Sequence, residues 1–167
     1  MSDVSTPPWA SLLPQRQPDQ IALVVDDLDA SMRTWSLLLG TGTWRVYSYG
    51  PGLMEYHTVR GEVTNYGMRL GLFGANPQLE LIESTLEPNI YAEQWQVQGP
   101  GLHHVGYFIE SIADLEDAFR EYGISPIQTG RGYGLDGDGG FAYYELPGFE
   151  CLVEFIEVPK RRKPSEV

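Results

Sequence analysis

A strand, a helix and three further strands are predicted twice along the chain, and this repeat constrains the fold more than any single motif. The assignments rest on β-rich runs bounded by turn residues and on helices with capping residues and apolar stripes. In the first copy, the elements are predicted at residues 20–25, 28–39, 44–47, 66–73 and 78–83. In the second copy, they are predicted at residues 103–109, 112–122, 124–128, 141–145 and 151–157. We therefore expect an α+β fold in which two βαβββ modules, at about 19–97 and 101–158, form one domain.

The two modules are expected to share a cleft. Each helix must cover one face of its own sheet, which leaves the opposite faces to meet across a common space. Polar side chains occupy matching places in the two copies, with Gln20 and His104 in the first strands and Glu80 and Glu154 in the last strands. Alternation puts each glutamate on the same face as apolar neighbours. A buried carboxylate must be paired or metal-bound, whereas an edge strand would leave Glu80 in water.

The strand at 103–109 carries two of the three histidines of the chain. Alternation places His104 on one face and His103 on the other, where His103 is predicted to be structural. A buried imidazole on an apolar strand is either a satisfied core residue or a ligand, so this strand alone leaves both interpretations open. The third histidine, His57, lies in residues 53–65, a stretch without a clear pattern. A flap over a pocket is one interpretation of that stretch.

Charge and composition exclude several classes of partner. The formal net charge of the chain is -12, so the phosphates of a nucleic acid would be repelled. No apolar run approaches the ~18 residues of a membrane helix, and no secretory signal is visible. The single cysteine, Cys151, excludes an internal disulfide and is typical of a reducing compartment. We therefore expect a cytoplasmic protein without a nucleic-acid or membrane partner.

The two ends of the chain are predicted to lie outside the domain. Residues 1–18 contain four prolines and little periodicity, which is typical of an extended arm. Trp9, Leu12 and Leu13 in this arm are suited to dock on the body of the protein or on a second subunit. Residues 159–167 carry a basic cluster of lysines and arginines, which is interpreted as a solvated tail.

Four short segments, in their order and spacing, resemble the vicinal oxygen chelate superfamily. They are Leu-Val-Val-Asp-Asp-Leu-Asp-Ala at 23–30, Leu-Glu-Leu-Ile-Glu at 79–83, Gly-Leu-His-His-Val-Gly at 101–106 and Leu-Val-Glu-Phe at 152–155. The resemblance covers residues 19–158 and implies paired βαβββ modules around a divalent metal ion. Ile-Tyr-Ala-Glu at 90–93, before Gly-Leu-His-His, resembles bacterial members that are similar to methylmalonyl-CoA epimerase.

The resemblance, carried over by position, places the four metal ligands at Gln20, Glu80, His104 and Glu154. Glyoxalase I enzymes use such a Gln/Glu/His/Glu set, whereas epimerases of the family more often have His first and Gln second. Val24 stands where glyoxalase I has an arginine that helps hold glutathione, which argues against a glutathione substrate. Extradiol dioxygenases bind Fe(II) with two His and one Glu, and Gln20 departs from that pattern.

This ligand set indicates the chemistry. One imidazole and three oxygens suit one divalent ion, such as Zn, Ni, Co, Mn or Fe(II), with positions left open for substrate oxygens. Such an ion stabilises a metal-bound enolate, so a proton α to a carbonyl can be removed near neutral pH. Glu154 is the first candidate for the base and Glu80 the second. The aromatic candidates for contact with a small-molecule substrate are Tyr66, Phe73, Trp95, Tyr133, Phe141 and Tyr143.

We therefore predict a metal-dependent isomerase, epimerase or lyase that forms a homodimer and acts on a small molecule. Two alternatives stay open. One is another metalloenzyme of the superfamily, such as a ring-cleaving dioxygenase. The other is a metal-free protein that sequesters a small molecule, as bleomycin-resistance proteins do. The clefts of those proteins lack the metal ligands, so the four polar residues favour an enzyme.

Overall fold

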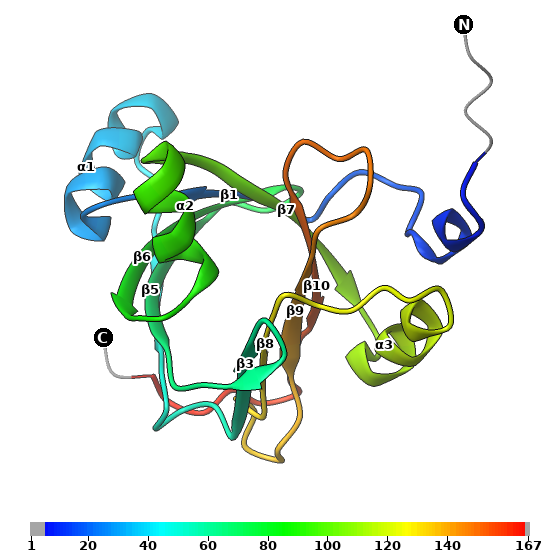
Figure 1. Cartoon of the computed structure of the whole chain (residues 1–167). Coiled ribbons are helices and arrows are strands. Elements are labelled where there is room, and N and C mark those ends of the chain that lie inside the picture. Colours follow the sequence, from blue (N-terminus) through cyan, green and yellow to red (C-terminus); the bar gives the residue numbers. More distant parts are fainter. Residues whose placement is uncertain (1–5, 166–167) are drawn as a thin grey trace, which may run out of the picture.

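The computed structural model describes residues 6–165 of the chain (Figure 1). Residues 1–5 of the expected arm and 166–167 of the expected tail lie outside the described residues. The helices are the 3-10 turn η1 (Pro8–Leu12), α1 (Leu28–Leu39), α2 (Ile90–Gln98) and α3 (Ile112–Arg120). The strands are β1 (Gln20–Val24), β2 (Arg45–Tyr49), β3 (Tyr56–Val59), β4 (Glu62–Val63), β5 (Gly67–Phe73), β6 (Gln78–Leu86), β7 (Gly101–Ile109), β8 (Gln128–Arg131), β9 (Gly140–Tyr144) and β10 (Leu152–Glu157). Within this described part, no helix has the length and apolar character needed to span a bilayer.

The strands form one mixed sheet that curls into a half-barrel (Figure 1). Its order is β2-β5-β6-β1-β7-β10-β9-β8-β3-β4. The first strands of the two modules, β1 and β7, pair antiparallel at the centre. On its other side each of them pairs in parallel with the last strand of its own module, β6 or β10. The predicted α+β fold of paired βαβββ modules is therefore confirmed.

Helices α1 and α3 begin where capping residues predict a start. Asp27 caps α1 by accepting a hydrogen bond from the N–H of Ala30 at 2.8 Å. Ser111 caps α3 by accepting one from the N–H of Asp114 at 3.2 Å. Both helices lie outside the curl of the sheet (Figure 1), α1 against β5 and β6 and α3 against β9 and β10. The inner face of the half-barrel is thus left free for the site.

The N-terminal arm packs against the body of its own chain. Trp9, Leu12 and Leu13 contact the buried apolar cluster that includes Phe119 of α3. This burial removes apolar surface of the arm and of the outer side of the sheet from water. Of the two docking sites that the sequence left open, the described part of the arm occupies the one on the protein's own body.

Residues 53–65 are not a flap. Strand β3 pairs antiparallel with β8 of the second module, and the hydroxyls of Thr58 and Thr129 hydrogen-bond at 2.8 Å. His57 in β3 is buried, with its ring centroid 5.5 Å from that of Tyr66. A segment from the first half of the chain therefore extends the sheet of the second half.

The C-terminal segment also differs from the solvated tail that its charge predicts. The N–H of Leu135 donates to the carbonyl of Arg161 at 2.8 Å, and the N–H of Lys163 donates to the carbonyl of Tyr133 at 3.0 Å. The Lys163 ammonium pairs with Glu55 at 2.9 Å. The interpretation failed because backbone hydrogen bonds of an extended segment leave no pattern in its side chains. The segment crosses the loop between β8 and β9 and fixes the positions of its basic residues.

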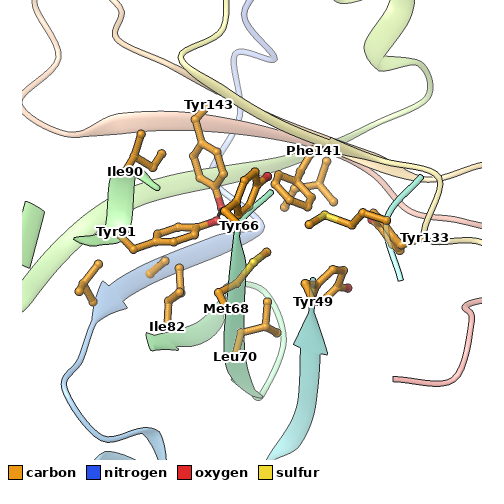
Figure 2. Close-up of a cluster of buried hydrophobic side chains, with 14 of the residues drawn as sticks. Tyr49, Tyr66, Met68, Leu70, Ile82, Ile90, Tyr91, Tyr133, Phe141 and Tyr143 are labelled. Atoms are coloured by element: carbon orange, nitrogen blue, oxygen red, sulfur yellow. Dashed lines mark hydrogen bonds between the residues drawn. The ribbon is translucent and has the colours of Figure 1, made fainter. Parts of the chain in front are cut away.

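The inner face of the half-barrel carries a cluster rich in aromatic side chains (Figure 2). Its members come from both modules, with Met68 and Leu70 from β5 opposite Phe141 and Tyr143 from β9. Tyr143 accepts a hydrogen bond from the hydroxyl of Tyr91 in α2 at 3.0 Å. Helix α2 therefore closes one end of the inner cluster, and the other end opens to solvent as a cleft.

Candidate metal centre and cleft

Three buried side chains meet where the two modules join. Glu80 of β6, His104 of β7 and Glu154 of β10 each offer one ligand atom, and these atoms all lie within 4.8 Å of one another. His104 Nε2 is 3.2 Å from Glu80 Oε2 and 2.9 Å from Glu154 Oε2. The pairing of β1 with β7 explains this arrangement, because it sets β6 and β10 on either side of His104.

Gln20, the fourth predicted ligand, lies on the same cleft as this group. It lies opposite Gly106 in the pairing of β1 with β7, and its side chain lines the same cleft as Glu80 and Glu154. Its amide N–H donates to Gln78 Oε1 at 3.2 Å, which turns Gln20 Oε1 away from that partner. A Cβ at Gly106 would lie 2.9 Å from Gln20 Oε1 and 3.0 Å from Gln20 Cβ. Glycine at 106 is therefore what leaves room for the Gln20 side chain.

The atoms of this set lack hydrogen-bond partners. Buried polar atoms in folded proteins are nearly always paired, so unpaired ones need an explanation. In the described residues, each of the four predicted ligands has one such buried atom: Gln20 Oε1, Glu80 Oε2, His104 Nε2 and Glu154 Oε2. The two contacts of His104 Nε2 are close enough for ion pairs but do not have hydrogen-bond geometry. One nitrogen and three oxygens without partners fit the ligand set of a divalent cation.

The electrostatics of the centre favour a proton on His104 when no cation is bound. Burial opposes the charged imidazole, but the carboxylates of Glu154 and Glu80 outweigh it and raise the pKa of His104 to about 9. Burial also raises the pKa of Glu80, an effect that the neighbouring His104 partly offsets. The protonated imidazole lies beside both carboxylates, where its positive charge takes the place that a cation would occupy.

Metal binding is therefore expected to displace a proton. Because the pKa of His104 is about 9 in the metal-free protein, its Nε2 is protonated at pH 7 and must lose the proton to become a ligand. We expect about one proton to be released per ion at pH 7, and less as the pH rises through 9. Calorimetric titration with Zn²⁺ in buffers of different ionisation enthalpy measures this number. Binding without proton release at pH 7 would remove His104 from the ligand set.

Strand alternation predicts that His103 and His104 lie on opposite faces, and this prediction is wrong. The register between β1 and β7 shifts at this point, because Ala22 pairs with His104 and Leu23 pairs with Leu102, which leaves His103 as the extra residue of a β-bulge. The bulge brings the two rings together, with Nδ1 of His103 and Nδ1 of His104 2.9 Å apart. His103 is still no member of the cluster, and it supports the ring of His104 from behind.

This contact determines how the two rings share protons. Burial, followed by the neighbouring His104, holds the pKa of His103 well below its usual value, so His103 is neutral. When His104 Nε2 serves as a ligand, its Nδ1 carries the proton and donates to His103 Nδ1. Partners of this kind orient metal-binding histidines and fix their tautomer.

The centre opens onto a cleft of about 310 Å³ on the inner face of the half-barrel. Gln20, Glu80 and Glu154 line it, while His104 is fully buried behind them. Three of the predicted aromatic residues are also in the lining: Tyr133, Phe141 and Tyr143. Their rings give the cleft an apolar wall beside the carboxylates.

The other three predicted aromatic residues do not line this cleft. Tyr66 is fully buried, and its hydroxyl donates to the carbonyl of Thr129 at 2.7 Å. Phe73 packs against Trp44 at the far end of β5, with ring centroids 5.2 Å apart. Trp95 lies one turn after Tyr91 in α2, is partly exposed, and lines a separate pocket outside the inner cluster that Tyr91 joins. The prediction that these three residues contact the substrate rested on their aromatic character, which does not determine where their side chains point.

Several residues of the cleft have no counterpart in the predicted set. Tyr49 of β2 and Arg162 of the C-terminal segment line the cleft, together with Met68 and Leu70 of β5. Burial raises the pKa of Tyr49 to about 12, so its hydroxyl stays protonated near neutral pH. The basic cluster at 160–163 was the one signal for Arg162, and that cluster gives no sign of which side chain enters the cleft.

The sequence matches a family model over most of its length. Residues 19–144 match the Glyoxalase/Bleomycin resistance protein/Dioxygenase superfamily. No curated protein sequence matches the chain.

Solved structures share the fold at low sequence identity. A hypothetical protein of Bacillus halodurans C-125 has a TM-score of 0.61 at 18% identity, with 89% of this chain and 98% of that chain covered. Methylmalonyl-CoA epimerase from Mycobacterium tuberculosis has a TM-score of 0.58 at 16% identity, with 89% and 94% covered. A Streptomyces coelicolor methylmalonyl-CoA epimerase variant in complex with 2-nitronate-propionyl-CoA has a TM-score of 0.54 at 18% identity, with 89% and 98% covered.

Proposed function

Because the chain belongs to the Glyoxalase/Bleomycin resistance protein/Dioxygenase superfamily, we propose that it is a metal-dependent enzyme that removes a proton α to a carbonyl group. An epimerase, an isomerase or a lyase can use this step. The observation that carries the proposal is the convergence of three buried ligand atoms, from Glu80, His104 and Glu154, beside an apolar cleft that Gln20 also lines. None of these atoms, nor Gln20 Oε1, has a hydrogen-bond partner among the described residues. Solved epimerases with the same fold support the choice of chemistry.

The ion would be held by Gln20, Glu80, His104 and Glu154. When bound, it supplies Lewis-acid stabilisation for the negative charge that develops on a carbonyl oxygen. The protein itself orients this set through the hydrogen bond from Gln20 to Gln78 and the contact of His103 with His104. Both contacts hold ligand side chains in place before the substrate arrives.

Glu154 is the residue that accepts the proton. It reaches the cleft from β10, where its side chain lies on the lining beside Tyr143 and Phe141. These rings exclude water from the carboxylate, which strengthens its electrostatic interactions with a bound substrate. Glu80 lies on the other side of His104 and is the second candidate for the same role.

The residues that line the cleft favour proton transfer over covalent catalysis. Among the described lining residues there is no Ser, Thr, Cys or Lys that could act as a nucleophile. Cys151 lies just before β10 and outside the cleft, and burial raises the pKa of its thiol. The groups that the chain supplies for catalysis are therefore a carboxylate base and a neighbouring cation site, which suit proton transfer.

Exchange of substrate hydrogen with solvent tests the proposal. Metal-loaded protein in D₂O is expected to incorporate deuterium at the α-carbon of a suitable carbonyl compound. The first compound is an acyl-CoA with a 2-methyl branch, and the second is a 2-hydroxy ketone. Mass spectrometry measures the incorporation, and protein treated with a chelator is the control. Tight binding of such compounds without exchange would favour a metal-free binding protein of the bleomycin-resistance type.

A further inference from the structure

We infer that Arg162 is the anion-binding residue of the cleft, so that the substrate carries an oxyanion group, carboxylate or phosphate, besides its carbonyl. The inference starts from the C-terminal segment, which is held at three points around this residue. The N–H of Lys160 donates to Asp138 Oδ2 at 2.8 Å, and the backbone of Arg162 forms a β-bridge with Gly134. The N–H of Lys163 donates to the carbonyl of Tyr133 at 3.0 Å. The backbone of Arg162 is therefore fixed.

The side chain of Arg162 is fixed as well. Its guanidinium lies over the ring of Tyr47 at 4.9 Å and over the ring of Tyr133 at 5.4 Å. One nitrogen, Nη1, donates a hydrogen bond to the hydroxyl of Tyr49. A guanidinium has five N–H donors, so most of those on Arg162 remain available to a ligand in the cleft. A planar group held in this way is suited to bind an oxyanion with two parallel hydrogen bonds.

Arg162 differs from its neighbours in having no carboxylate partner. Arg161 pairs with Asp136 at 2.6 Å, and Lys163 pairs with Glu55 at 2.9 Å. Within residues 6–165, no ion pair of Arg162 is formed, although Asp and Glu outnumber Lys and Arg by 23 to 11 in the whole chain. In so acidic a protein, a half-buried arginine without a carboxylate partner indicates that its partner is the ligand.

The charge balance of the cleft points the same way. Glu80 and Glu154 together carry two negative charges, which a divalent ion would neutralise. Arg162 would then leave a positive charge on the lining of the cleft, and Arg45 adds an exposed cation whose Nη2 donates to the carbonyl of Gly74 at 3.5 Å. An anionic substrate is repelled by the overall charge of -12 and needs such a local site.

This assignment rests on the proposed function, because the carbonyl end of the substrate is placed at the metal centre. It adds the second end of the molecule, held by Arg162 with Tyr49 and Tyr133 beside it. Tyr133, Phe141 and Tyr143 also line this cleft, so we expect the part of the substrate between the two ends to be apolar.

Binding of simple aromatic anions to the metal-loaded protein tests the assignment. The probes are benzoate, phenyl phosphate and the neutral analogue benzamide, each measured by calorimetry. In Arg162→Gln, we expect the affinity for the preferred anion to fall at least about tenfold, with benzamide unchanged. Arg161→Gln removes the same charge from the same segment outside the cleft and is expected to bind all three probes like the wild type. The stronger of the two anions identifies carboxylate or phosphate as the natural group.

Two outcomes would overturn the assignment. One is equal affinity of Arg162→Gln and Arg161→Gln for both anions, and the other is no binding of either anion by the wild type. If Arg162→Gln does not fold, Arg162→Lys replaces it. That variant keeps the charge but loses the planar fork, and an unchanged affinity for the preferred anion would contradict the bidentate contact.

Metal content and deuterium exchange, measured on the same proteins, separate this assignment from the proposed function. If the wild type has metal and exchange but its anion binding does not depend on Arg162, the proposed function is supported and the anion site is contradicted. If anion binding depends on Arg162 but the wild type has neither metal nor exchange, the anion site is supported and the proposed function is contradicted. A rise in KM with little change in kcat in Arg162→Lys would agree with a binding role.

Discussion

Replacing Glu154 with glutamine is expected to abolish exchange of the α-proton while much of the metal is retained. The amide oxygen can still serve as a ligand, but the amide cannot accept a proton. General-base catalysis contributes about 10²–10⁴-fold to such steps, so the exchange rate should fall by that factor. Deuterium incorporation and elemental analysis on the same sample measure the two effects separately.

Glu150→Gln is the matched control for this variant. Glu150 is exposed in the turn before β10, so the loss of its charge should leave exchange unchanged. Undiminished exchange in Glu154→Gln would assign the base to Glu80, and Glu80→Gln would then show the loss. If exchange falls only in proportion to metal content, Glu154 acts as a metal ligand and not as the base.

Replacing His104 with asparagine is expected to remove nearly all of the bound metal. The four-donor set would lose its one nitrogen, and Glu80 and Glu154 would be left buried without the group that lies within 3.2 Å of both. Leaving buried charges without a partner costs about 3–5 kcal/mol, so the free energy of unfolding should fall as well. Elemental analysis of protein purified without chelator measures the metal, and chemical denaturation measures the stability.

His103→Asn is the control for this second variant. Its imidazole contacts His104 Nδ1 and offers no atom to the cluster, so this variant should still bind metal. Loss of a supporting contact behind a ligand lowers metal affinity by about 10–100-fold, which sets the expected effect. Loss of metal in His103→Asn with retention in His104→Asn would reverse the two roles. Equal metal content in the wild type and a Gln20/Glu80/His104 triple-alanine variant would overturn the site.

The repeat and the alternation of side chains were enough to predict the fold and the facing of the two glutamates. Glu80 and Glu154 lie in regular strands whose parallel partners, β1 and β7, keep their register around them. His103 shows the limit of this reasoning. One extra residue in β7 changes the facing there, and a bulge of this kind depends on the partner strand, not on the local pattern.

The parts that the sequence did not predict depend on contacts between distant segments. The inward turn of Arg162 follows from backbone hydrogen bonds with the loop between β8 and β9, which no periodicity records. Tyr66 and Trp95 show that the sequence also did not predict which aromatic side chains reach the cleft. Both are aromatic residues near the expected cleft, yet packing directs Tyr66 into the core and Trp95 outward.

The pairing of β3 with β8 makes the two halves of the chain dependent on each other during folding. Thr58 and Thr129 are 71 residues apart in sequence, so the first half is synthesised long before its partner strand exists. Until then the edge of β3 that faces away from β4 is unpaired, which favours association with other chains. A fragment that ends after α2 would lack β8, so this edge of β3 would stay unpaired. If two chains exchanged their second halves, β3 of each chain would pair with β8 of the other. We therefore expect the duplicated modules, although alike in topology, not to fold as independent units.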